Sequence, residues 1–347
     1  MQNLSVLSLE SGMVVAKDVH SGKYELLIPK GSVLTEDSIW KLSRHNVTSV
    51  YVEELSDELS SKIRSSSEFQ AFTQHYEAQI SFLKDNLNTV VETHLPLSID
   101  SLVKNVMKLL LSCDGRANIL LILENMRAYD DSTYAHSLNV ALLCSLMATW
   151  LKMSKEDTEM LTVCGLLHDI GKLLIPNSIT TKPAKLTQAQ YEEMKRHPLL
   201  GYQLLYSQNI DSRICEAALL HHERTDGSGY PFGRKSWQIP AFAKIVAIAD
   251  VYDAMTANRV YRGPICPFNV IKSIEDEAFQ KYEVAYVLTF LEQVAMSYIN
   301  DSCRLSNGLQ GKIVYLDKHH LSRPTVQCGS EYVDLTKHPD LTIEAML

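Results

Sequence analysis

The feature that most constrains the fold is helical periodicity sustained through the middle of the chain. Between residues 100 and 302, apolar side chains recur with a period near 3.6, and glycine and proline concentrate between the periodic segments. The clearest segments are SLVKNVMKLLL, SLNVALLCSLMATWL, DTEMLTVCGLLHDIG, RICEAALLHH and FAKIVAIADVYDAMTA. We therefore expect residues 100–302 to form one mainly α domain, an all-helical bundle.

Segments of different character flank this helical region. Residues 1–55 alternate short apolar runs with turn residues around one helical stretch, which predicts a small α+β domain with a sensory or docking role. Residues 56–99 are polar with helical spacing and predict a linker helix, although the serines at 65–67 could mark a flexible break. The same spacing would allow a homodimer through this helix. Residues 303–347 carry NG and GS turns between β-like runs and predict a short C-terminal β subdomain.

Composition narrows the class of protein. With 46% hydrophobic and 21% charged residues, the chain resembles an ordinary globular protein. A formal net charge of −8 disfavours DNA binding, because non-specific binding needs a basic face. The seven cysteines are scattered without a CxxC pair, which argues against disulfides and thiolate zinc sites and fits a reducing cytoplasm. There is no signal-peptide pattern and no apolar run long enough to span a bilayer, so we expect a cytoplasmic protein without membrane insertion.

Several histidines and aspartates of the helical region are candidate metal ligands. A single histidine on an apolar helix is more often a core or capping residue than a ligand. An ionised carboxylate in a core is costly unless it is paired or bound to metal, and Asp250 lies inside the apolar run IVAIADVY. The whole set is best explained if the side chains converge on cations. The candidates are His136, His168, Asp169, His197, His221, His222 and Asp250.

The types of donor indicate which metals would bind. Imidazole and carboxylate ligands without cysteine suit iron, manganese or similar ions. Seven ligands are too many for one tetrahedral site but suit two octahedral-type ions that share a carboxylate. Two metals about 3.5–4 Å apart form a clamp for in-line attack on phosphorus, and a water that bridges them becomes hydroxide near neutral pH. We therefore expect a dinuclear site with two divalent ions, most simply iron or manganese.

Three basic side chains could contact an anionic substrate. Lys172 follows His168 by four residues in HDIGK, where its ammonium could hold a phosphate oxygen or simply be solvated at a helix end. Arg259 and Arg262 are three residues apart in TANRVYRGP. They could flank a phosphate or be a pair of surface arginines, and their spacing does not decide between these interpretations.

Four motifs of the helical region resemble, in their order and spacing, those of the HD-GYP family of bacterial signalling phosphodiesterases, a branch of the HD superfamily. The motifs are HDIGK, HP, HHERTDGSGYP and ADVYDAMTANRVYR. The resemblance covers roughly residues 110–300. It implies hydrolysis of cyclic dinucleotides, chiefly cyclic di-GMP, to linear pGpG, with further cleavage to GMP left open. It places the seven candidates at metal-ligand positions, with Asp169 bridging. It also gives catalytic roles to Asp169 and Lys172, and substrate-contact positions to Lys172, Arg259, Arg262, Gly229, Tyr230 and Pro231.

One position departs from the pattern of some family members, which carry a glutamate four residues before the first metal histidine. Here that position is Ser132. Asp130 and Asp131 lie nearby but are rotated off that face of a regular helix. We therefore expect two metals per chain rather than three.

Two alternatives for the function remain open at the level of sequence. The substrate could be another cyclic dinucleotide such as cyclic GMP-AMP, or the domain could be a weakly active cyclic di-GMP receptor. A receptor is the weaker alternative, because a degenerate site would be expected to lose ligands and this chain keeps all seven. The expected partners are the cyclic dinucleotide, a second copy of the chain and signalling proteins at the GYP loop.

Overall fold

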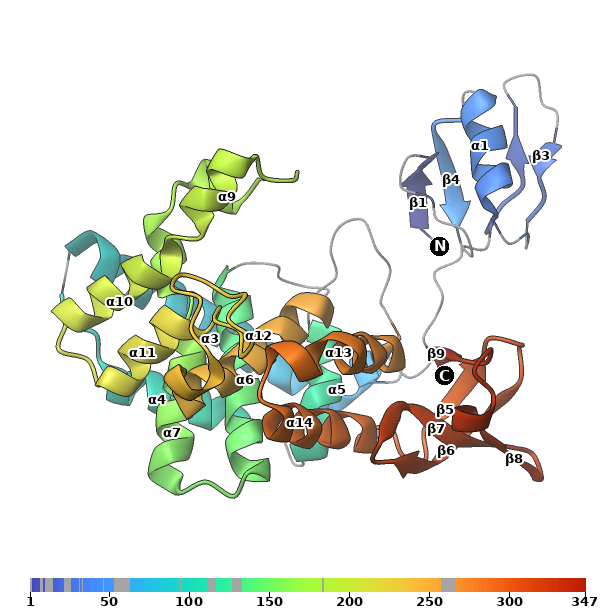
Figure 1. Ribbon diagram of the computed structural model, residues 1–347. Helices are drawn as coiled ribbons and strands as arrows, with labels where there is room; N and C mark the ends of the chain where they lie inside the picture. Colours follow the sequence, from blue (N-terminus) through green and yellow to red (C-terminus); the bar gives the residue numbers. More distant parts are fainter. Residues whose placement is uncertain are drawn as a thin grey trace. The chain divides into compact units, whose positions relative to one another are not determined.

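The computed structural model divides the chain into two compact units, residues 1–61 and 62–347, and each unit is described by itself. The structure describes residues 2–6, 9, 15–21, 26–30, 32, 34–45, 47–52, 63–93, 95–111, 116–126, 133–182, 184–256 and 266–347 (Figure 1).

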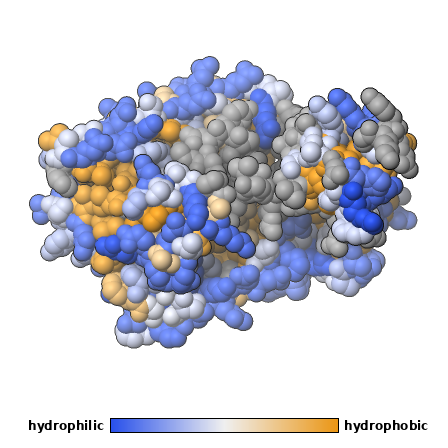
Figure 2. Space-filling view, turned by 90° about the horizontal axis from the view of Figure 1, so that it is seen from above, coloured by the Kyte–Doolittle hydropathy of each residue, from blue (hydrophilic) through white to orange (hydrophobic). Residues whose placement is uncertain are grey.

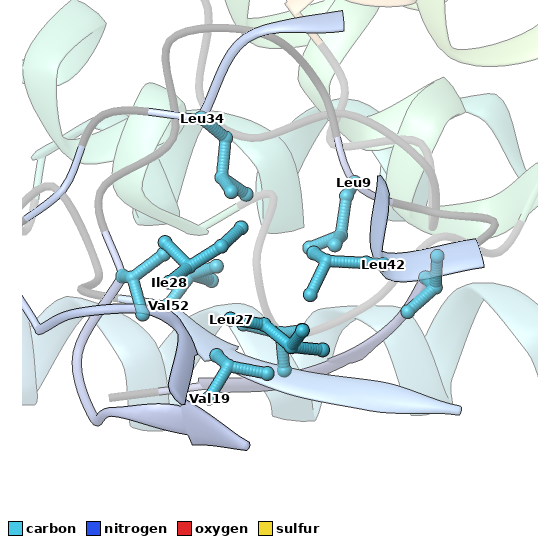
Figure 3. Close-up of a cluster of buried hydrophobic side chains, with 10 residues drawn as sticks. Leu9, Val19, Leu27, Ile28, Leu34, Leu42 and Val52 are labelled. Atoms are coloured by element: carbon cyan, nitrogen blue, oxygen red, sulfur yellow. The ribbon is translucent and has the colours of Figure 1, made fainter. Parts of the chain in front are cut away.

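The N-terminal unit is a small α+β structure. Its strands β1 (Gln2–Ser5) and β4 (Ser49–Val52) form one antiparallel pair, and β2 (Val19–His20) and β3 (Leu26–Ile28) form another. Helix α1 (Glu36–Arg44) begins after Thr35, whose hydroxyl accepts a hydrogen bond from the backbone N–H of Ser38 in a capping box. The core of the unit is apolar (Figure 3) and includes Leu9, Val19, Leu27, Ile28, Leu34, Leu42 and Val52.

The second unit is mainly helical, which confirms the predicted fold class. Its α-helices are α3 (Ser67–Thr93), α4 (Ile99–Leu111), α5 (Arg116–Met126), α6 (Thr133–Trp150), α7 (Lys155–Leu167), α8 (Asn177–Thr180), α9 (Gln188–Met194), α10 (His197–Ser207), α11 (Ser212–Leu220), α12 (Ala241–Thr256), α13 (Pro267–Lys281) and α14 (Val284–Met296). Short 3₁₀ helices are η2 (Ile170–Leu174), η3 (Ser236–Gln238) and η4 (Leu335–Lys337).

Helices α6, α7 and α12 pack against one another in this unit (Figure 1). Helix α6 is apolar on all sides and almost every residue from 135 to 148 is buried, as expected for a helix that neighbours surround. Helix α7 begins after Ser154, whose hydroxyl accepts a hydrogen bond from the backbone N–H of Asp157. The mutual packing of these helices fixes the ends that carry several of the candidate ligands.

The predicted linker helix is α3, and it packs on α4 and α6 within the second unit. Its start is capped by Ser66, whose hydroxyl accepts a hydrogen bond from the N–H of Phe69, so the serine-rich stretch here begins a helix. The Tyr76 hydroxyl donates a 2.6 Å hydrogen bond to Oδ1 of Asn139 on α6. Leu83 and Leu87 of the apolar stripe are buried against the chain's own helices. The stripe that would allow a dimer is therefore already covered, and the dimer stays a prediction.

The C-terminal residues form a five-stranded antiparallel sheet with the strand order β8-β7-β6-β5-β9. Its strands are β5 (Ser302–Leu305), β6 (Gln310–Asp317), β7 (His320–Cys328), β8 (Glu331–Asp334) and β9 (Ile343–Met346). Strand β7 packs on α13 and α14. The Glu275 carboxylate on α13 accepts a 2.7 Å hydrogen bond from the N–H of Leu321 and another from the Ser322 hydroxyl, which joins the sheet to the bundle.

Across the described residues, none of the helices has both the length and the apolar character needed to cross a bilayer. The face in Figure 2 is largely hydrophilic, and apolar patches interrupt it at the left and at the right of the view. Exposed apolar residues are ordinary on folded proteins, so we infer no partner from these patches.

Candidate metal centre

The seven candidate ligands come together where several helices begin or end. Most of them stand at a terminus, so their side chains reach a common centre from different directions. His136 lies in the first turn of α6, His168 ends α7, Asp169 precedes η2, His197 begins α10, His221 and His222 follow α11, and Asp250 lies within α12.

The ligand atoms of these residues fall into two groups, and within each group all of them lie within 4.8 Å of one another. The first group is Asp169, His197, His221 and His222, and the second is His136, His168 and Asp250. Each group offers imidazole and carboxylate donors without sulfur, which suits borderline or hard divalent cations. The described residues therefore provide clusters that could bind metal.

Asp169 belongs to the first group but also lies close to the second. Its Oδ1 is 3.1 Å from Nε2 of His197, in the first group. Its Oδ2 is 3.3 Å from Nε2 of His168 and 3.4 Å from Nε2 of His136, both in the second group. The two oxygens of one carboxylate thus face different groups, which is the arrangement that a bridging ligand requires.

Several buried polar atoms of the centre have no hydrogen-bond partner within the described structure. They are both carboxylate oxygens of Asp169 and Nε2 of His168. Nζ of Lys172 forms an ion pair with Oδ2 of Asp169, but no hydrogen bond of normal geometry reaches either oxygen. Leaving buried polar atoms unpaired costs free energy, and coordinated cations would satisfy these atoms. The residues present therefore fit a metal centre.

Backbone hydrogen bonds orient three of the imidazoles. Nδ1 of His168, His197 and His221 lies 2.7, 2.7 and 2.9 Å, respectively, from the carbonyl oxygen of the residue three positions earlier. A carbonyl oxygen only accepts, so Nδ1 carries the proton and donates it. Nε2 of each ring then keeps its lone pair and faces the centre, as a metal ligand must.

His136 is oriented by Asp253, a residue that is not among the sequence-predicted site residues. Nδ1 of His136 lies 2.8 Å from Oδ2 of Asp253, which is 3% exposed. Asp253 follows Asp250 by three residues in DVYDAM, so both carboxylates project from one face of α12. That spacing is the signal in the sequence that could have identified Asp253.

Burial keeps two imidazoles of the first group neutral. Desolvation lowers the pKa of His221 to about 4 and the pKa of His222 well below its usual value. Desolvation raises the pKa of Asp169, but the charges of Lys172 and His168 outweigh it and hold this pKa well below the ordinary range. Neutral imidazoles and an ionised carboxylate are the forms that bind metal.

In the second group, three carboxylates lie close to the His136 imidazole. Desolvation opposes ionisation of Asp250, but its contact with His136 holds its pKa well below the usual value. Desolvation likewise opposes protonation of His136, yet the carboxylates of Asp169, Asp250 and Asp253 raise its pKa well above the usual value. Three carboxylates around one imidazole make this side of the centre attractive to a cation.

The loop after His222 is held against the centre by Glu223, which is also absent from the sequence-predicted site residues. Its buried carboxylate accepts hydrogen bonds from the backbone N–H groups of Phe232, at 2.7 Å, and Arg234, at 2.8 Å. A Cβ at Gly229 would lie 2.4 Å from the carbonyl oxygen of His222, so a larger residue does not fit here. Close backbone packing therefore explains the glycine of the GYP sequence.

The structure places the other predicted site residues as follows. Lys172 contacts Asp169 from η2. Tyr230 stacks on His222, with ring centroids 4.6 Å apart, and Gly229 and Pro231 flank it in the loop. Substrate contact by these loop residues stays a prediction. Arg259, Arg262, Asp130, Asp131 and Ser132 lie outside the described residues.

Comparison with known proteins finds an HD domain in this chain. The HD domain family model matches residues 120–285. The cyclic di-GMP phosphodiesterase PA4108 of Pseudomonas aeruginosa is 32% identical over 213 residues, which cover 60% of this chain and 51% of that protein. The 3'3'-cGAMP-specific phosphodiesterase 1 of Vibrio cholerae serotype O1 is 38% identical over 164 residues, which cover 46% of this chain and 37% of that protein.

Among solved structures, the chain is similar to Bd1817, a HDG"Y"P protein from Bdellovibrio bacteriovorus, with a TM-score of 0.49 and 16% identity. The match covers 83% of this chain and 97% of that one. The chain spans about half or less of the length of the two curated relatives. The HD domain match includes both HDIGK and HHERTDGSGYP, so this part of the chain is an HD domain, and its motifs resemble those of the HD-GYP family.

Proposed function

We propose that the protein is a metal-dependent phosphodiesterase that hydrolyses cyclic di-GMP to linear pGpG. The position of Asp169 carries the proposal, because its two oxygens face two separate groups of metal ligands. The curated relative from Pseudomonas aeruginosa is named for this activity, and its similarity extends over 213 residues. Both observations favour an enzyme over a receptor, since a receptor would not need a complete set of metal ligands.

The ligand set supports two divalent ions, with iron or manganese as the proposed metals. Asp169, His197, His221 and His222 would hold one ion, and His136, His168 and Asp250 would hold the other, with Asp169 shared between them. When bound, such ions polarise a phosphoryl oxygen and acidify water. The absence of cysteine from both groups makes iron or manganese the better match to the donors.

The residues of the centre differ in exposure, and the difference indicates where a phosphodiester would approach. The side chains of His168 and His221 are fully buried. Those of His136, His222 and Lys172 are 19%, 17% and 24% exposed. The substrate must therefore approach on the side where these three side chains meet solvent.

Lys172 is well placed to bind a phosphate on that side. Its Nζ lies against the Asp169 carboxylate, at the boundary between the buried ligands and solvent. Desolvation opposes its charge, but Asp169 raises the pKa of Lys172, so the side chain is a cation at neutral pH. A fixed ammonium here would stabilise the negative charge that develops on the phosphoryl oxygens during attack.

A second candidate substrate is a mixed cyclic dinucleotide, 3'3'-cGAMP. The observation that favours it is the relative from Vibrio cholerae, which is named as specific for that molecule and is 38% identical over 164 residues. Selection between purines depends on base contacts. The two arginines predicted to make such contacts, Arg259 and Arg262, lie outside the described residues.

The direct test is to purify the protein anaerobically, measure its metal content and incubate it with each cyclic dinucleotide. Products are resolved by chromatography. We expect pGpG from cyclic di-GMP, with slower turnover of 3'3'-cGAMP. Faster turnover of 3'3'-cGAMP would replace the first candidate with the second. Tight binding of cyclic di-GMP without any product, by protein that is loaded with metal, would support a receptor and exclude both.

Variants of the ligands test whether this centre carries the activity. Asp250→Ala and His222→Ala should each abolish turnover while leaving most of the helix content, because each removes one ligand. Asp169→Ala should have the largest effect, since its carboxylate faces both groups. Asp276→Asn is a matched control, because Asp276 lies on the surface of α13 in an ion pair with Lys272. Near wild-type activity with full metal content in any ligand variant would show that the assigned centre is wrong.

A further inference from the structure

His222 differs from the other four histidines of the centre. His168, His197 and His221 each donate from Nδ1 to a backbone carbonyl, and His136 is hydrogen-bonded to Asp253. Within the described part of the chain, neither ring nitrogen of His222 has a hydrogen-bond partner. Its nearest carboxylate contact is Nδ1 to Oδ2 of Asp250, at 3.8 Å. No hydrogen bond therefore fixes the rotation of this imidazole.

Aromatic contacts surround the His222 ring in place of a hydrogen bond. The Tyr230 ring stacks on it, with centroids 4.6 Å apart and an interplanar angle of 29°. The His197 ring meets it edge-on, with centroids 5.0 Å apart and an angle of 89°. A stacked ring on one side and a perpendicular ring on another leave the imidazole little freedom to rotate.

We propose that Tyr230 is a positioning residue, whose ring holds the His222 imidazole in the orientation that its metal requires. Outer partners that orient a ligating histidine are normally hydrogen-bond acceptors, and here the stacked phenol ring takes their place. The inference rests on the proposed function, because it assigns Tyr230 a task within the proposed metal centre. It also gives the tyrosine of the GYP loop a role that does not depend on contact with substrate.

The loop is built to keep Tyr230 in place. The backbone N–H of Tyr230 donates a 3.2 Å hydrogen bond to the carbonyl oxygen of His222. Gly229 lies so close to the His222–Arg224 backbone that a Cβ would collide with it. Beyond Tyr230, Glu223 accepts backbone hydrogen bonds from Phe232 and Arg234. The tyrosine is thus fixed on both sides, and the buried Glu223 adjoins the ligand that Tyr230 orients.

The test measures metal binding in the absence of substrate. Metal-stripped protein is titrated with Mn²⁺ against a competing chelator, and free Mn²⁺ is followed by electron paramagnetic resonance. In Tyr230→Leu the stacked ring is lost, and we expect the affinity for one of the bound ions to fall about 10–100-fold, as when an outer partner of a ligand is removed. Tyr230→Phe keeps the ring, so it should bind Mn²⁺ as the wild type does.

A matched control and a second variant separate positioning from folding. Tyr282→Leu removes another ring beside the same loop. That ring faces the Arg224 guanidinium rather than a ligand, and Cζ of Arg224 lies 4.6 Å from the centroid of the Tyr282 ring. Tyr282→Leu should leave Mn²⁺ affinity unchanged. Glu223→Gln keeps the Tyr230 ring but weakens the loop anchor, and we expect a smaller loss in the same direction. If Tyr230→Leu fails to fold, Glu223→Gln provides the test alone.

The possible results separate a failure of the proposed metal-dependent function from a failure of the positioning role of Tyr230. If the wild type binds no Mn²⁺, the proposed metal-dependent function fails, and this inference fails with it. If the wild type binds Mn²⁺ and both Tyr230→Leu and Glu223→Gln bind it equally well, only the positioning role is overturned. An equal loss in Tyr230→Phe and Tyr230→Leu would also overturn it, because the hydroxyl rather than the stacked ring would then be responsible.

Discussion

Oδ2 of Asp253 lies 2.8 Å from Nδ1 of His136, although the two residues are 117 positions apart in the sequence. Nε2 of the same imidazole lies 3.1 Å from Oδ1 of Asp250. One turn of α12 therefore supplies both a carboxylate proposed as a metal ligand and a carboxylate that orients a histidine proposed as another. Such outer carboxylates fix the tautomer and raise the basicity of the ring.

Replacing Asp253 should weaken metal binding without removing a ligand. In Asp253→Asn the charge that supports His136 is lost, and we expect the metal affinity of the second group to fall about 10–100-fold. Chelator competition on the substrate-free protein measures the change. Asp276→Asn, which removes one exposed carboxylate from α13, should leave the affinity unchanged. Unchanged affinity in Asp253→Asn as well would mean that Asp253 does not support the ligand.

Gly171 provides a prediction about stability. A Cβ at this position would lie 2.0 Å from the carbonyl oxygen of His197 and 2.6 Å from the backbone nitrogen of Gly201. Because backbone atoms cannot move aside cheaply, Gly171→Ala should force η2 away from α10, at a cost of about 1–3 kcal/mol or more in the free energy of unfolding.

The matched control for Gly171 lies on the other side of the same contact. A Cβ at Gly201 would meet its nearest atom at 3.2 Å, so Gly201→Ala should be tolerated much better. Thermal unfolding of the metal-stripped proteins compares the two variants. Equal melting temperatures would contradict the close approach of η2 and α10, and with it the way in which His197 is brought to Asp169.

The fold class was predictable because helical periodicity depends on local sequence. The apolar spacing of residues 100–302 indicates helices whatever their partners are, and the structure has them. The surroundings of α3 were not predictable in the same way. Its apolar stripe shows that one face is buried, but periodicity does not identify the partner. In the structure that face packs within the second unit, with Tyr76 bonded to Asn139.

The candidate ligands were recognisable because buried histidines and aspartates are costly without partners. The residues that orient these ligands were not recognised, because their roles follow from contacts in the folded structure rather than from a pattern in the sequence. The role of Asp253 is seen only in its distance to His136. The role of Glu223 is seen only in the hydrogen bonds that it accepts from backbone N–H groups nine and eleven residues later in the chain. The spacing of Asp250 and Asp253 on one helix was a usable signal, whereas Glu223 within HHERTDG gave none.

Lys172→Ala should separate catalysis from metal binding. Lys172 forms an ion pair with Asp169 but is not itself a ligand, so the variant should keep its metal. Loss of one charge-assisted contact to the phosphoryl group should cost about 2–4 kcal/mol in the transition state, seen as a lower kcat. Lys272→Ala, on the surface of α13, serves as the control. If metal content falls in parallel with the rate, Lys172 supports the structure of the centre instead.

The number of metals is a separate prediction. The seven candidate ligands form two groups, and Ser132 stands four residues before His136, where some members of the HD-GYP family carry a glutamate. A serine cannot supply the charged carboxylate that a third cation would need. We therefore expect two metals per chain, measured by elemental analysis of anaerobically purified protein. Three ions per chain in the wild type would contradict the argument.

A centre with two metals also predicts the product. Opening the cyclic substrate requires one attack on phosphorus, which two metals suffice to support. The linear product carries a new terminal phosphate, and a third cation would help to hold that charge for a second cleavage. We therefore expect pGpG to accumulate, with GMP forming slowly or not at all in a time course followed by chromatography. Ser132→Glu should raise the metal content or speed the second cleavage, whereas Ser132→Gln, which adds a similar side chain without the charge, should do neither. Direct appearance of GMP from the wild type, with no pGpG intermediate, would show that two metals and Ser132 do not limit the reaction in this way.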